Sequence, residues 1–291
     1  MFADLHLHSV YSDGSDTPDE LILLAEKHEI SVVSIADHDT VSGYRYISNA
    51  ENTSVTIIPA IEISTILGHN YLHILGYYIN TDSQELTAYI QKVSDEKTEN
   101  TRINFENAVH QGCFSYDWKR VLELHRDQPR ISGVHVVYSM QKDGYNIDGM
   151  SLWDMFHKFF WAESSVFIPT ETATAYDAID IIKKVNGVPI IAHPKSIGND
   201  DTVVDLLRYG ALGLEVFHPV HKKDDVLKYQ QLAETENVYI SGGTDWHGKN
   251  NGAEVTHFGM CGLENDNYPI LHLESLKCEN LAGNDGFMHV K

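Results

Sequence analysis

The opening segment Asp4–Gly14 constrains this chain more than any other stretch. Side chains alternate between the two faces of a strand, so an extended segment over residues 2–8 would project His6 and His8 from one face. Neutral imidazole is the commonest protein ligand for zinc, manganese and iron. Asp13 precedes a glycine in a turn that would carry its carboxylate back toward the strand end. Taken alone, the segment also fits a strand with two solvent-facing histidines. The rest of the sequence is needed to distinguish this interpretation from a metal site.

Short apolar segments typical of buried strands alternate with helix signals in two parts of the chain. Thr17 as N-cap and Glu20 three residues later predict a capped helix over residues 17–28. Further helices are expected over residues 41–50 and 173–186. The expected strands cover residues 2–8, 31–36, 55–61, 71–78, 188–192, 212–217 and 238–241. Strands that alternate with helices indicate an α/β protein, and seven such strands predict a barrel of about this length.

This alternation stops between residues 81 and 169. One long amphipathic helix is expected over residues 84–110, followed by shorter helices over 117–125, 134–141 and 151–160. We interpret residues 81–169 as a helical insertion that caps a barrel formed by residues 1–80 and 170–291. A separately folding domain is the less favoured alternative, because the alternating pattern resumes afterwards and needs its first half. The tail from Glu264 onward is polar, and its sequence indicates no function.

Composition excludes several classes of protein. The chain has 42 acidic and 21 basic residues, for a formal charge of −21, which opposes stable binding to duplex nucleic acid. Cys113, Cys261 and Cys278 are widely spaced, so neither a disulfide framework nor a thiolate zinc site is expected. The sequence shows no basic and apolar leader and no run of 18 apolar residues. A soluble, cytoplasmic protein without membrane contact is expected.

Side chains that bind hard or borderline metals follow nearly every expected strand. Parallel barrels place their chemistry at the carboxyl ends of several strands at once, so these side chains should meet. The nine residues are His6, His8, Asp13, His38, Glu62, His73, His193, Asp245 and His247. A single histidine at a strand end is most often a hydrogen-bonded histidine without a metal. Nine such residues predict a polynuclear metal site.

In combination these motifs resemble the PHP (polymerase and histidinol phosphatase) family of metallophosphoesterases. The residues that carry the resemblance are Asp4 to Ser9, Ser12 to Gly14, Asp37 to Thr40, Ile61 to Ser64, His73 to Tyr77, Ala192 to Pro194, Glu215 to Pro219 and Thr244 to Gly248. The resemblance implies a distorted (β/α)7 TIM-like barrel that holds two to three divalent ions of manganese, zinc or iron. Residues 74–77, the helical insertion and residues 167–169 are most similar to the branch that acts on nucleoside 3′,5′-bisphosphates and short RNA ends.

The resemblance also implies an assignment of ligands to ions. His6, His8, Glu62 and Asp245 would hold one ion; Glu62, His73 and His193 a second, bridged to it; and Asp13, His38 and His247 a third. Asp245, His247 and His218 would be the catalytic residues. The expected reaction is hydrolysis of a small phosphomonoester, a nucleotide or a related compound, by metal-bound hydroxide. Asp4, Asp37 and Asp39 would either orient the histidines or serve as turn and capping residues.

The insertion departs from the named branch in one respect. That branch commonly carries two arginines around a histidine, and the corresponding positions here are Gly133, Val134, His135 and Tyr138. Arginine forms a planar, bidentate phosphate clamp, so another cation must replace it or the substrate lacks a second phosphate. Arg130, His135, Lys195 and His218 are the candidate substrate-binding residues. Arg130 could equally be a solvated surface residue.

Two other functions fit the same motifs. One is an amidohydrolase-type metallohydrolase that acts on a carbonyl substrate, because such enzymes also use His-x-His strands in barrels. The other is a nuclease or proofreading module, since the PHP family also occurs attached to replicative polymerases. The acidic composition and the length of the sequence favour an enzyme that acts on a small phosphorylated substrate. The sequence does not indicate an oligomeric state.

Overall fold

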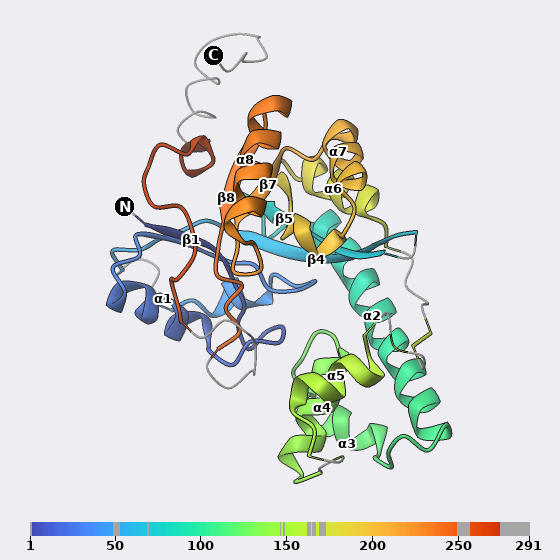
Figure 1. The fold of residues 1–291 in the computed structure, drawn as a ribbon. Coiled ribbons are helices and arrows are strands. Elements are labelled where there is room, and N and C mark those ends of the chain that lie inside the picture. The colour runs from blue at the N-terminus through green and yellow to red at the C-terminus, as the bar shows by residue number, and fades with distance from the viewer. Residues whose placement is uncertain are drawn as a thin grey trace.

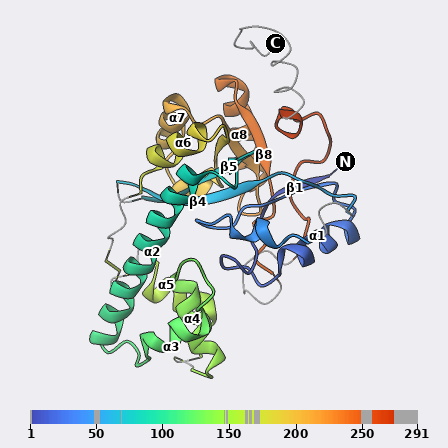
Figure 2. The ribbon, with the colours of Figure 1, turned by 180° about the vertical axis from the view of Figure 1, so that it is seen from behind.

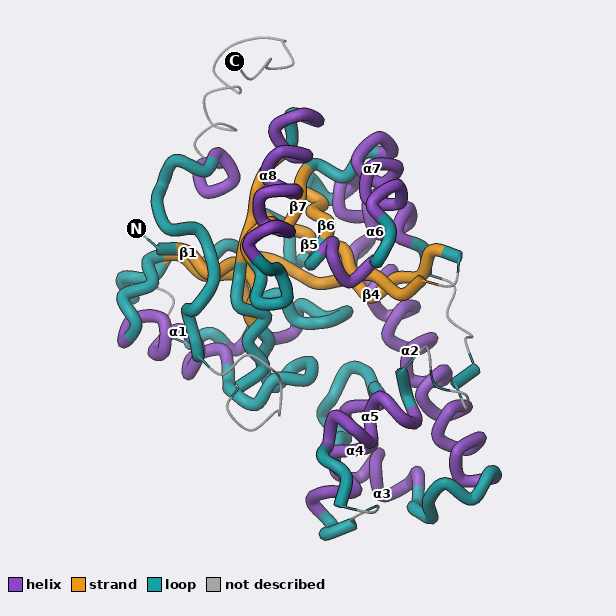
Figure 3. The backbone as a smooth tube through the Cα atoms, in the orientation of Figure 1, coloured by secondary structure: helices purple, strands orange, loops and turns teal. Residues whose placement is uncertain are grey.

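Two β-sheets form the centre of the larger part of this protein (Figure 1; Figure 3). The computed structural model describes residues 2–48, 53–68, 70–145, 147, 149–161, 164, 167–168, 173–248 and 257–273. The first sheet contains β1 (Ala3–Leu7), β2 (Val32–Ile35) and β3 (Thr56–Ile57), all parallel. The second contains β4 (Ala60–Leu67), β5 (Asn70–Tyr77), β6 (Val188–Ile191), β7 (Gly213–Phe217) and β8 (Tyr239–Gly242).

The expected α/β class is confirmed, whereas a single closed barrel is not seen among the described residues. The two sheets are linked at their ends by isolated parallel bridges, one between Leu7 and Trp246 and one between His38 and Glu62. Strand β5 runs antiparallel to both β4 and β6, so the second sheet is mixed. Antiparallel neighbours can be joined by a tight hairpin, and β4 and β5 are separated by only two residues. The expectation of uniformly parallel strands was wrong at this hairpin.

The expected strand over residues 55–61 is divided in two. Pro59 lies between β3 and β4, and proline cannot donate a backbone hydrogen bond to a strand ladder. Strand β4 then continues well past the expected end to Leu67. As a result Glu62 is the third residue of a long strand and does not follow a strand end. The described residues therefore contain eight strands where seven were expected.

Helices cover the outer faces of the sheets (Figure 1). They are α1 (Pro18–Lys27), α6 (Ala175–Lys184), α7 (Asp200–Tyr209) and α8 (Lys223–Glu236). Thr17 and Glu20 form the expected capping box of α1, in which each side chain bonds the backbone N–H of the other residue. Three short 3₁₀ turns complete this part: η1 (Ser42–Tyr46), η2 (Pro194–Ile197) and η3 (Pro269–His272). The helix expected over residues 41–50 is only the turn η1, and residues 49–50 lie outside the described part.

Four further helices form a separate helical segment of the fold, which we call the α2–α5 segment. They are α2 (Gln84–His110), α3 (Trp118–Leu124), α4 (Gly133–Lys142) and α5 (Leu152–Phe159), each within about two residues of its expected bounds. Figures 1 and 2 show α3, α4 and α5 grouped away from the strands, with α2 running from them to the sheets. An apolar cluster of their own, which includes Phe105, Val137, Met140 and Phe159, holds them together.

The sheets have their own apolar cores. One cluster packs β4, β5 and β7 against α6 and α7, with Ile63, Ile74, Ile179 and Leu214 all fully buried. Each buried side chain of this size contributes roughly 1.5–3 kcal/mol through removal of apolar surface from water. None of the helices in the described ranges is long and apolar enough to cross a membrane. This packing fixes the strands whose edges carry the polar side chains described next.

Candidate metal centre

The side chain of Glu62 lies at the centre of the candidate site. Its Oε2 atom is 3.2 Å from His6 Nε2, 3.3 Å from His8 Nε2 and 3.1 Å from His38 Nδ1. All four residues are less than 10% exposed. One carboxylate oxygen therefore faces three ring nitrogens that come from β1, from the residue directly after β1 and from the loop after β2.

The other oxygen of Glu62 faces two further histidines. Its Oε1 atom is 2.9 Å from His73 Nδ1 and 3.1 Å from His193 Nε2. His73 lies within strand β5 and not at its end. The face of the strand from which its ring projects, and not a position after the strand, brings it to Glu62. Glu62 thus contacts five of the expected ligand residues, as a bridging carboxylate would.

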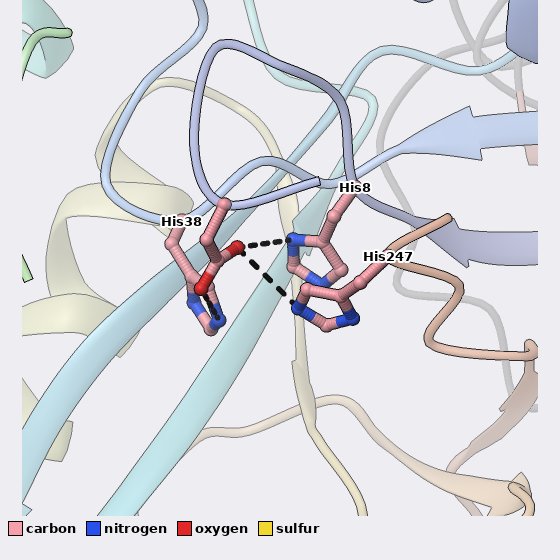
Figure 4. Close-up of side chains that lie close together, drawn as sticks. His8, His38 and His247 are labelled. Carbon is pink, nitrogen blue, oxygen red and sulfur yellow. Dashed lines mark ion pairs between the residues drawn. The ribbon is translucent and has the colours of Figure 1, made fainter. Parts of the chain in front are cut away.

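A second carboxylate, that of Asp13, lies near the rings of His8, His38 and His247 (Figure 4). Its oxygens lie 3.3 Å from His247 Nε2 and 3.9 Å from both His8 Nδ1 and His38 Nε2. Figure 4 shows the three rings turned toward this one carboxylate. The turn after β1 therefore brings Asp13 back to the strand end, which is the placement that the sequence indicated.

Asp245 is the third carboxylate of the cluster. Its Oδ1 atom lies 2.9 Å from His8 Nε2, 3.4 Å from His6 Nε2 and 3.6 Å from His247 Nδ1. Its Oδ2 atom lies 3.4 Å from His218 Nε2. The backbone of Asp245 has a φ of 53°, in the left-handed region that non-glycine residues rarely adopt. Backbone strain of this kind recurs at functional sites, where the surrounding structure holds it.

Four groups of these side chains could each hold a metal ion, judged from the mutual distances of their ligand atoms. They are His6, His8, Glu62 and Asp245; His8, Asp13, His38 and His247; His38, Glu62 and His73; and His6, Glu215 and His218. The first is the set that the family resemblance implied, and the second is an implied set with His8 added. In the third, His38 stands where His193 was expected, although His193 still contacts Glu62. All nine expected residues lie in one connected cluster.

The donor atoms in this cluster fit bound cations. His6 Nε2, both ring nitrogens of His8, His38 Nδ1, Glu62 Oε2 and Asp245 Oδ1 are buried and make no hydrogen bond within the described part of the chain. An unsatisfied buried polar atom costs about 1–3 kcal/mol of stability. The presence of several such atoms at one place therefore calls for a bonding partner that is not a protein group, such as a metal ion. Imidazole and carboxylate donors together suit manganese, zinc and iron.

The electrostatics of the cluster keep its carboxylates ionised. Burial would raise the pKa of Glu62, but His38, His73 and His6 hold that pKa well below its usual range. Burial likewise opposes ionisation of Asp245, yet His6 and His247 hold its pKa well below normal. Burial lowers the pKa of His38 well below normal, against the attraction of Glu62 and Asp13. Burial also opposes protonation of His8, but Asp245 and Glu62 raise its pKa to about 10, so a cation that binds His8 must displace a proton.

Two buried aspartates beside the cluster shape its loops. Asp37 accepts hydrogen bonds from the Ser9 N–H (2.7 Å) and from the hydroxyls of Ser9 and Ser12 (both 2.6 Å). Asp4 accepts from the Thr244 N–H (2.9 Å) and hydroxyl (2.6 Å), and burial raises the pKa of Asp4 to about 7. Asp4 also accepts a hydrogen bond of 3.3 Å from the His6 backbone N–H. The bonds of both aspartates therefore go to backbone N–H groups and hydroxyls in or next to candidate ligands.

Glu215 belongs to the site, although it was not among the expected ligands. Its Oε1 atom lies 2.8 Å from His6 Nδ1, and its Oε2 atom accepts a hydrogen bond of 2.8 Å from the His193 backbone N–H. A proton held on Nδ1 by this carboxylate leaves the Nε2 lone pair of His6 facing Glu62. A fully buried glutamate in the middle of the apolar strand β7 was the available signal, because such residues are almost never buried without a partner.

Close backbone packing explains the glycine at position 243, next to Thr244. A Cβ atom on Gly243 would lie 2.4 Å from the backbone nitrogen of His6, which is shorter than real Cβ contacts allow. The loop after β8 can therefore pass β1 only with glycine at this position. That close approach lets the Asp245 N–H donate to the His6 carbonyl oxygen at 2.8 Å, which places the Asp245 side chain beside the histidines.

Arg130 is buried, so the expectation that it could be a solvated surface residue is wrong. It is 3% exposed, and its Nη1 atom lies 3.1 Å from Asp39 Oδ2. Asp39 directly follows His38 and accepts a hydrogen bond from the Ser64 N–H at 2.7 Å. The Nε atom of Arg130 is buried and makes no hydrogen bond to the described residues. Arg130 thus connects the α2–α5 segment to a loop that carries a candidate ligand.

His135 and Lys195 are both engaged with protein atoms. His135 Nδ1 accepts from the Ser132 N–H at 3.0 Å, and its Nε2 lies 2.8 Å from the Ser12 carbonyl oxygen. Burial lowers the pKa of His135 to about 3. Lys195 Nζ lies 2.7 Å from Asp225 Oδ2. With both of its ring nitrogens used, His135 holds α4 against the loop that carries Asp13.

A cavity of about 230 Å³ opens beside the cluster. Four candidate ligands line it, Asp13, His38, His73 and His247, together with Arg130 and aromatic residues from the α2–α5 segment and β5. Neither Lys195 nor His218 lines this cavity. Substrate-sized space therefore adjoins the candidate metal centre on the side of the helical segment.

Comparisons with known proteins relate this chain to phosphoesterases and exoribonucleases. The PHP domain family matches residues 4–142. A phosphoribosyl 1,2-cyclic phosphate 1,2-diphosphodiesterase from Eggerthella lenta is 26% identical, over 89% of this chain and 98% of that protein. A 3′,5′-nucleoside bisphosphate phosphatase from Chromobacterium violaceum is 27% identical, over 87% and 90%. A 5′-3′ exoribonuclease from Haemophilus influenzae is 26% identical, over 84% and 89%.

Solved structures share the fold. One, described as an amidohydrolase from Chromobacterium violaceum with bound sulfate and no metal, superposes with a TM-score of 0.80 at 23% identity, over 94% of this chain and 96% of that one. Another, from Bifidobacterium adolescentis and assigned to the metal-dependent phosphoesterases, gives a TM-score of 0.79 at 22% identity, over 97% and 98%. The PHP family match over residues 4–142 and the curated relatives confirm the resemblance to PHP phosphoesterases, and the names of these relatives indicate a hydrolase.

Proposed function

We propose that this chain hydrolyses a small phosphomonoester, a nucleotide or a related compound, with two to three divalent ions held by the nine clustered side chains. The observation that carries the proposal is the contact of one carboxylate, Glu62, with five histidines at 2.9–3.3 Å. Manganese, zinc and iron are the ions that suit this donor set. Bound there, divalent ions would acidify a water that attacks phosphorus and would neutralise charge on the phosphate oxygens.

The residues of the chain have separate tasks in this proposal. Glu62 would bridge two ion positions, and Asp13 and Asp245 would complete the sets on either side of His8. His247 lines the cavity and would contact the phosphate there. His218 is held 3.4 Å from Asp245 and acts on the reaction through that carboxylate. Glu215 fixes the ring of His6 from behind.

Arg130 is the proposed contact for a substrate anion, in place of the two arginines that the insertion lacks. It lines the cavity together with Lys97, and its guanidinium is held in position by Asp39. A guanidinium that is already oriented loses little further freedom on binding a phosphate or carboxylate. Lys195 lies outside this cavity, and His135 has both ring nitrogens engaged, so Arg130 has the stronger support.

Two features of the architecture belong to the same proposal. The two sheets and their bridges act as one distorted barrel around the cluster, formed by residues 1–80 and 170–291. Residues 81–169 form a cap, since α2, α4 and α5 contribute Lys97, Gly133 and Trp153 to the cavity. Lids of this kind exclude water and select substrate in many enzymes.

A comparison of three substrate classes tests the proposed reaction. The manganese-loaded protein should hydrolyse p-nitrophenyl phosphate and leave a matched carboxylic ester and amide intact, which separates a phosphoesterase from an amidohydrolase. In oxygen-18 water, a single turnover should place one label in the released phosphate, because water and no protein side chain attacks phosphorus. Hydrolysis of the ester or amide alone, or a trapped phosphorylated side chain, would contradict the proposal.

Two measurements with single-stranded RNA test the nuclease alternative. Binding that weakens steeply with salt would indicate contacts to the RNA backbone, and faster release of nucleotides from an RNA end than of phosphate from a mononucleotide would favour a nuclease.

A further inference from the structure

Aromatic side chains form two groups that line the cavity beside the candidate metal centre. Tyr71 and Phe167 meet edge to face, with ring centroids 5.6 Å apart. Trp153 and Phe156 of α5 meet in the same way at 5.4 Å, and Trp161 follows at 5.7 Å from Phe156. All five line the one cavity. We call them the aromatic chamber.

The chamber is continuous with the candidate metal centre. Tyr71 and His73 lie two positions apart on β5, so their side chains project from the same face of that strand. His73 is 2.9 Å from Glu62, and both Tyr71 and His73 line the cavity. A phosphate held at the cluster would therefore leave the organic part of its ester next to the chamber.

The chamber also has surface that a ligand would cover. Trp161 is 41% exposed, although it is one of the largest apolar side chains. The indole Nε1 atom of Trp153 is buried and makes no hydrogen bond with the described residues. A buried indole N–H usually finds an acceptor, and a ring with a nitrogen or carbonyl oxygen at its edge would supply one.

We propose that the aromatic chamber binds the planar ring of a heteroaromatic group in the substrate, stacked on its aromatic side chains, with the Trp153 indole N–H donating to an acceptor at the ring edge. This inference rests on the proposed function for the position of the phosphate. It separates a ring-bearing phosphomonoester from a simple sugar or alkyl phosphate, since flat π-faces stack on aromatic rings whereas puckered rings do not.

Binding of unreactive phosphonates to the manganese-loaded protein tests the chamber without requiring turnover. Calorimetry would compare 2-phenylethylphosphonate with 2-cyclohexylethylphosphonate, which differ in the planarity of the ring. Stacking of one ring on aromatic side chains predicts about tenfold tighter binding of the phenyl compound. Equal affinities, or tighter binding of the cyclohexyl compound, would overturn the chamber as a site for planar rings.

Variants locate the effect. Phe156→Leu should remove most of the preference for the phenyl compound, whereas Trp118→Leu should keep it, because Trp118 packs in the same helical cluster but does not line the cavity. Trp153→Phe keeps a ring but removes the donor, so it should abolish any added affinity of 2-(2-pyridyl)ethylphosphonate over the phenyl compound. A pyridyl advantage unchanged in Trp153→Phe would assign the acceptor contact to another residue and contradict this part of the proposal.

The failure of this inference can be told apart from a failure of the proposed function. Hydrolysis of ethyl phosphate, which has no ring, reports on the metal centre alone. If ethyl phosphate is hydrolysed and ring selectivity is absent, only the chamber is wrong. If ring selectivity is found while no phosphomonoester is hydrolysed, the chamber stands and the proposed reaction is wrong.

Discussion

The candidate metal centre and the α2–α5 segment are built in opposite ways. The centre is polar and buried, and its side chains come from positions as distant in the chain as His6 and His247. The α2–α5 segment is held by apolar contacts between helices that are neighbours in the chain. The candidate site therefore depends on polar residues that are far apart in the sequence, whereas the helical segment depends on apolar residues that are close together in it.

Removal of the central carboxylate should have the largest effect. Glu62→Gln keeps the size of the side chain but loses the charge that five histidines face. We expect the protein to lose more than one bound ion and kcat/KM for a phosphomonoester to fall about a thousandfold or more. Metal analysis and steady-state kinetics measure the two changes. Glu85→Gln, on the exposed start of α2, is the matched control, and full metal content in Glu62→Gln would refute the bridging role.

Glu215→Gln tests the support behind His6. The amide can no longer hold the Nδ1 proton of His6 as a carboxylate does, so we expect metal affinity to fall about 10- to 100-fold. Competition with a fluorescent chelator measures the affinity. KM for substrate should change less than metal affinity, because Glu215 does not line the cavity. An unchanged affinity would mean that Glu215 contributes only to folding.

Arg130→Met tests the link between the two regions. Loss of one charged hydrogen bond to the substrate should raise KM about tenfold while kcat changes less. The single variant also strands the charge of Asp39, so the double variant Arg130→Met with Asp39→Asn separates binding from stability. Arg102→Met on the exposed face of α2 is the control. A KM that returns to normal in the double variant would show that Arg130 serves the fold and not the substrate.

The pH dependence of stability tests the contact of α4 with the Asp13 loop. Burial lowers the pKa of His135 to about 3 in the folded protein, against about 6.5 when unfolded. Below pH 6.5 the unfolded chain therefore binds a proton that the folded chain does not, and stability is lost as pH falls. Between pH 7.5 and 6 this histidine should account for up to about 1 kcal/mol, which His135→Gln removes. Urea unfolding of both proteins at the two pH values measures it, and identical pH slopes would contradict the burial of a neutral ring.

The sequence predicted which nine side chains would cluster, because histidines and carboxylates next to apolar strands are rare. It did not predict the path of the chain around them. Pro59 ends β3 early, and the hairpin of β4 and β5 places Glu62 within a strand and not after one. Glu215 was not assigned a role because its partner, His6, is distant in the sequence; its position in an apolar strand was the local signal that a partner was needed.

The helices of the α2–α5 segment were predicted closely because helical periodicity is a local signal. The cavity that they border was not predicted. Its lining combines Tyr71 from β5 with Trp153 from α5, and this combination depends on how the segment packs against the sheets. The burial of Arg130 depends on the same packing and on Asp39.

The metal content of the purified protein tests the central claim most directly. After purification in buffer supplemented with manganese, zinc and iron, and removal of loosely bound ions, elemental analysis should find two to three divalent ions per chain. That number follows from the three carboxylates and six histidines that lie in one cluster. A content near zero under these conditions would contradict a polynuclear metal centre.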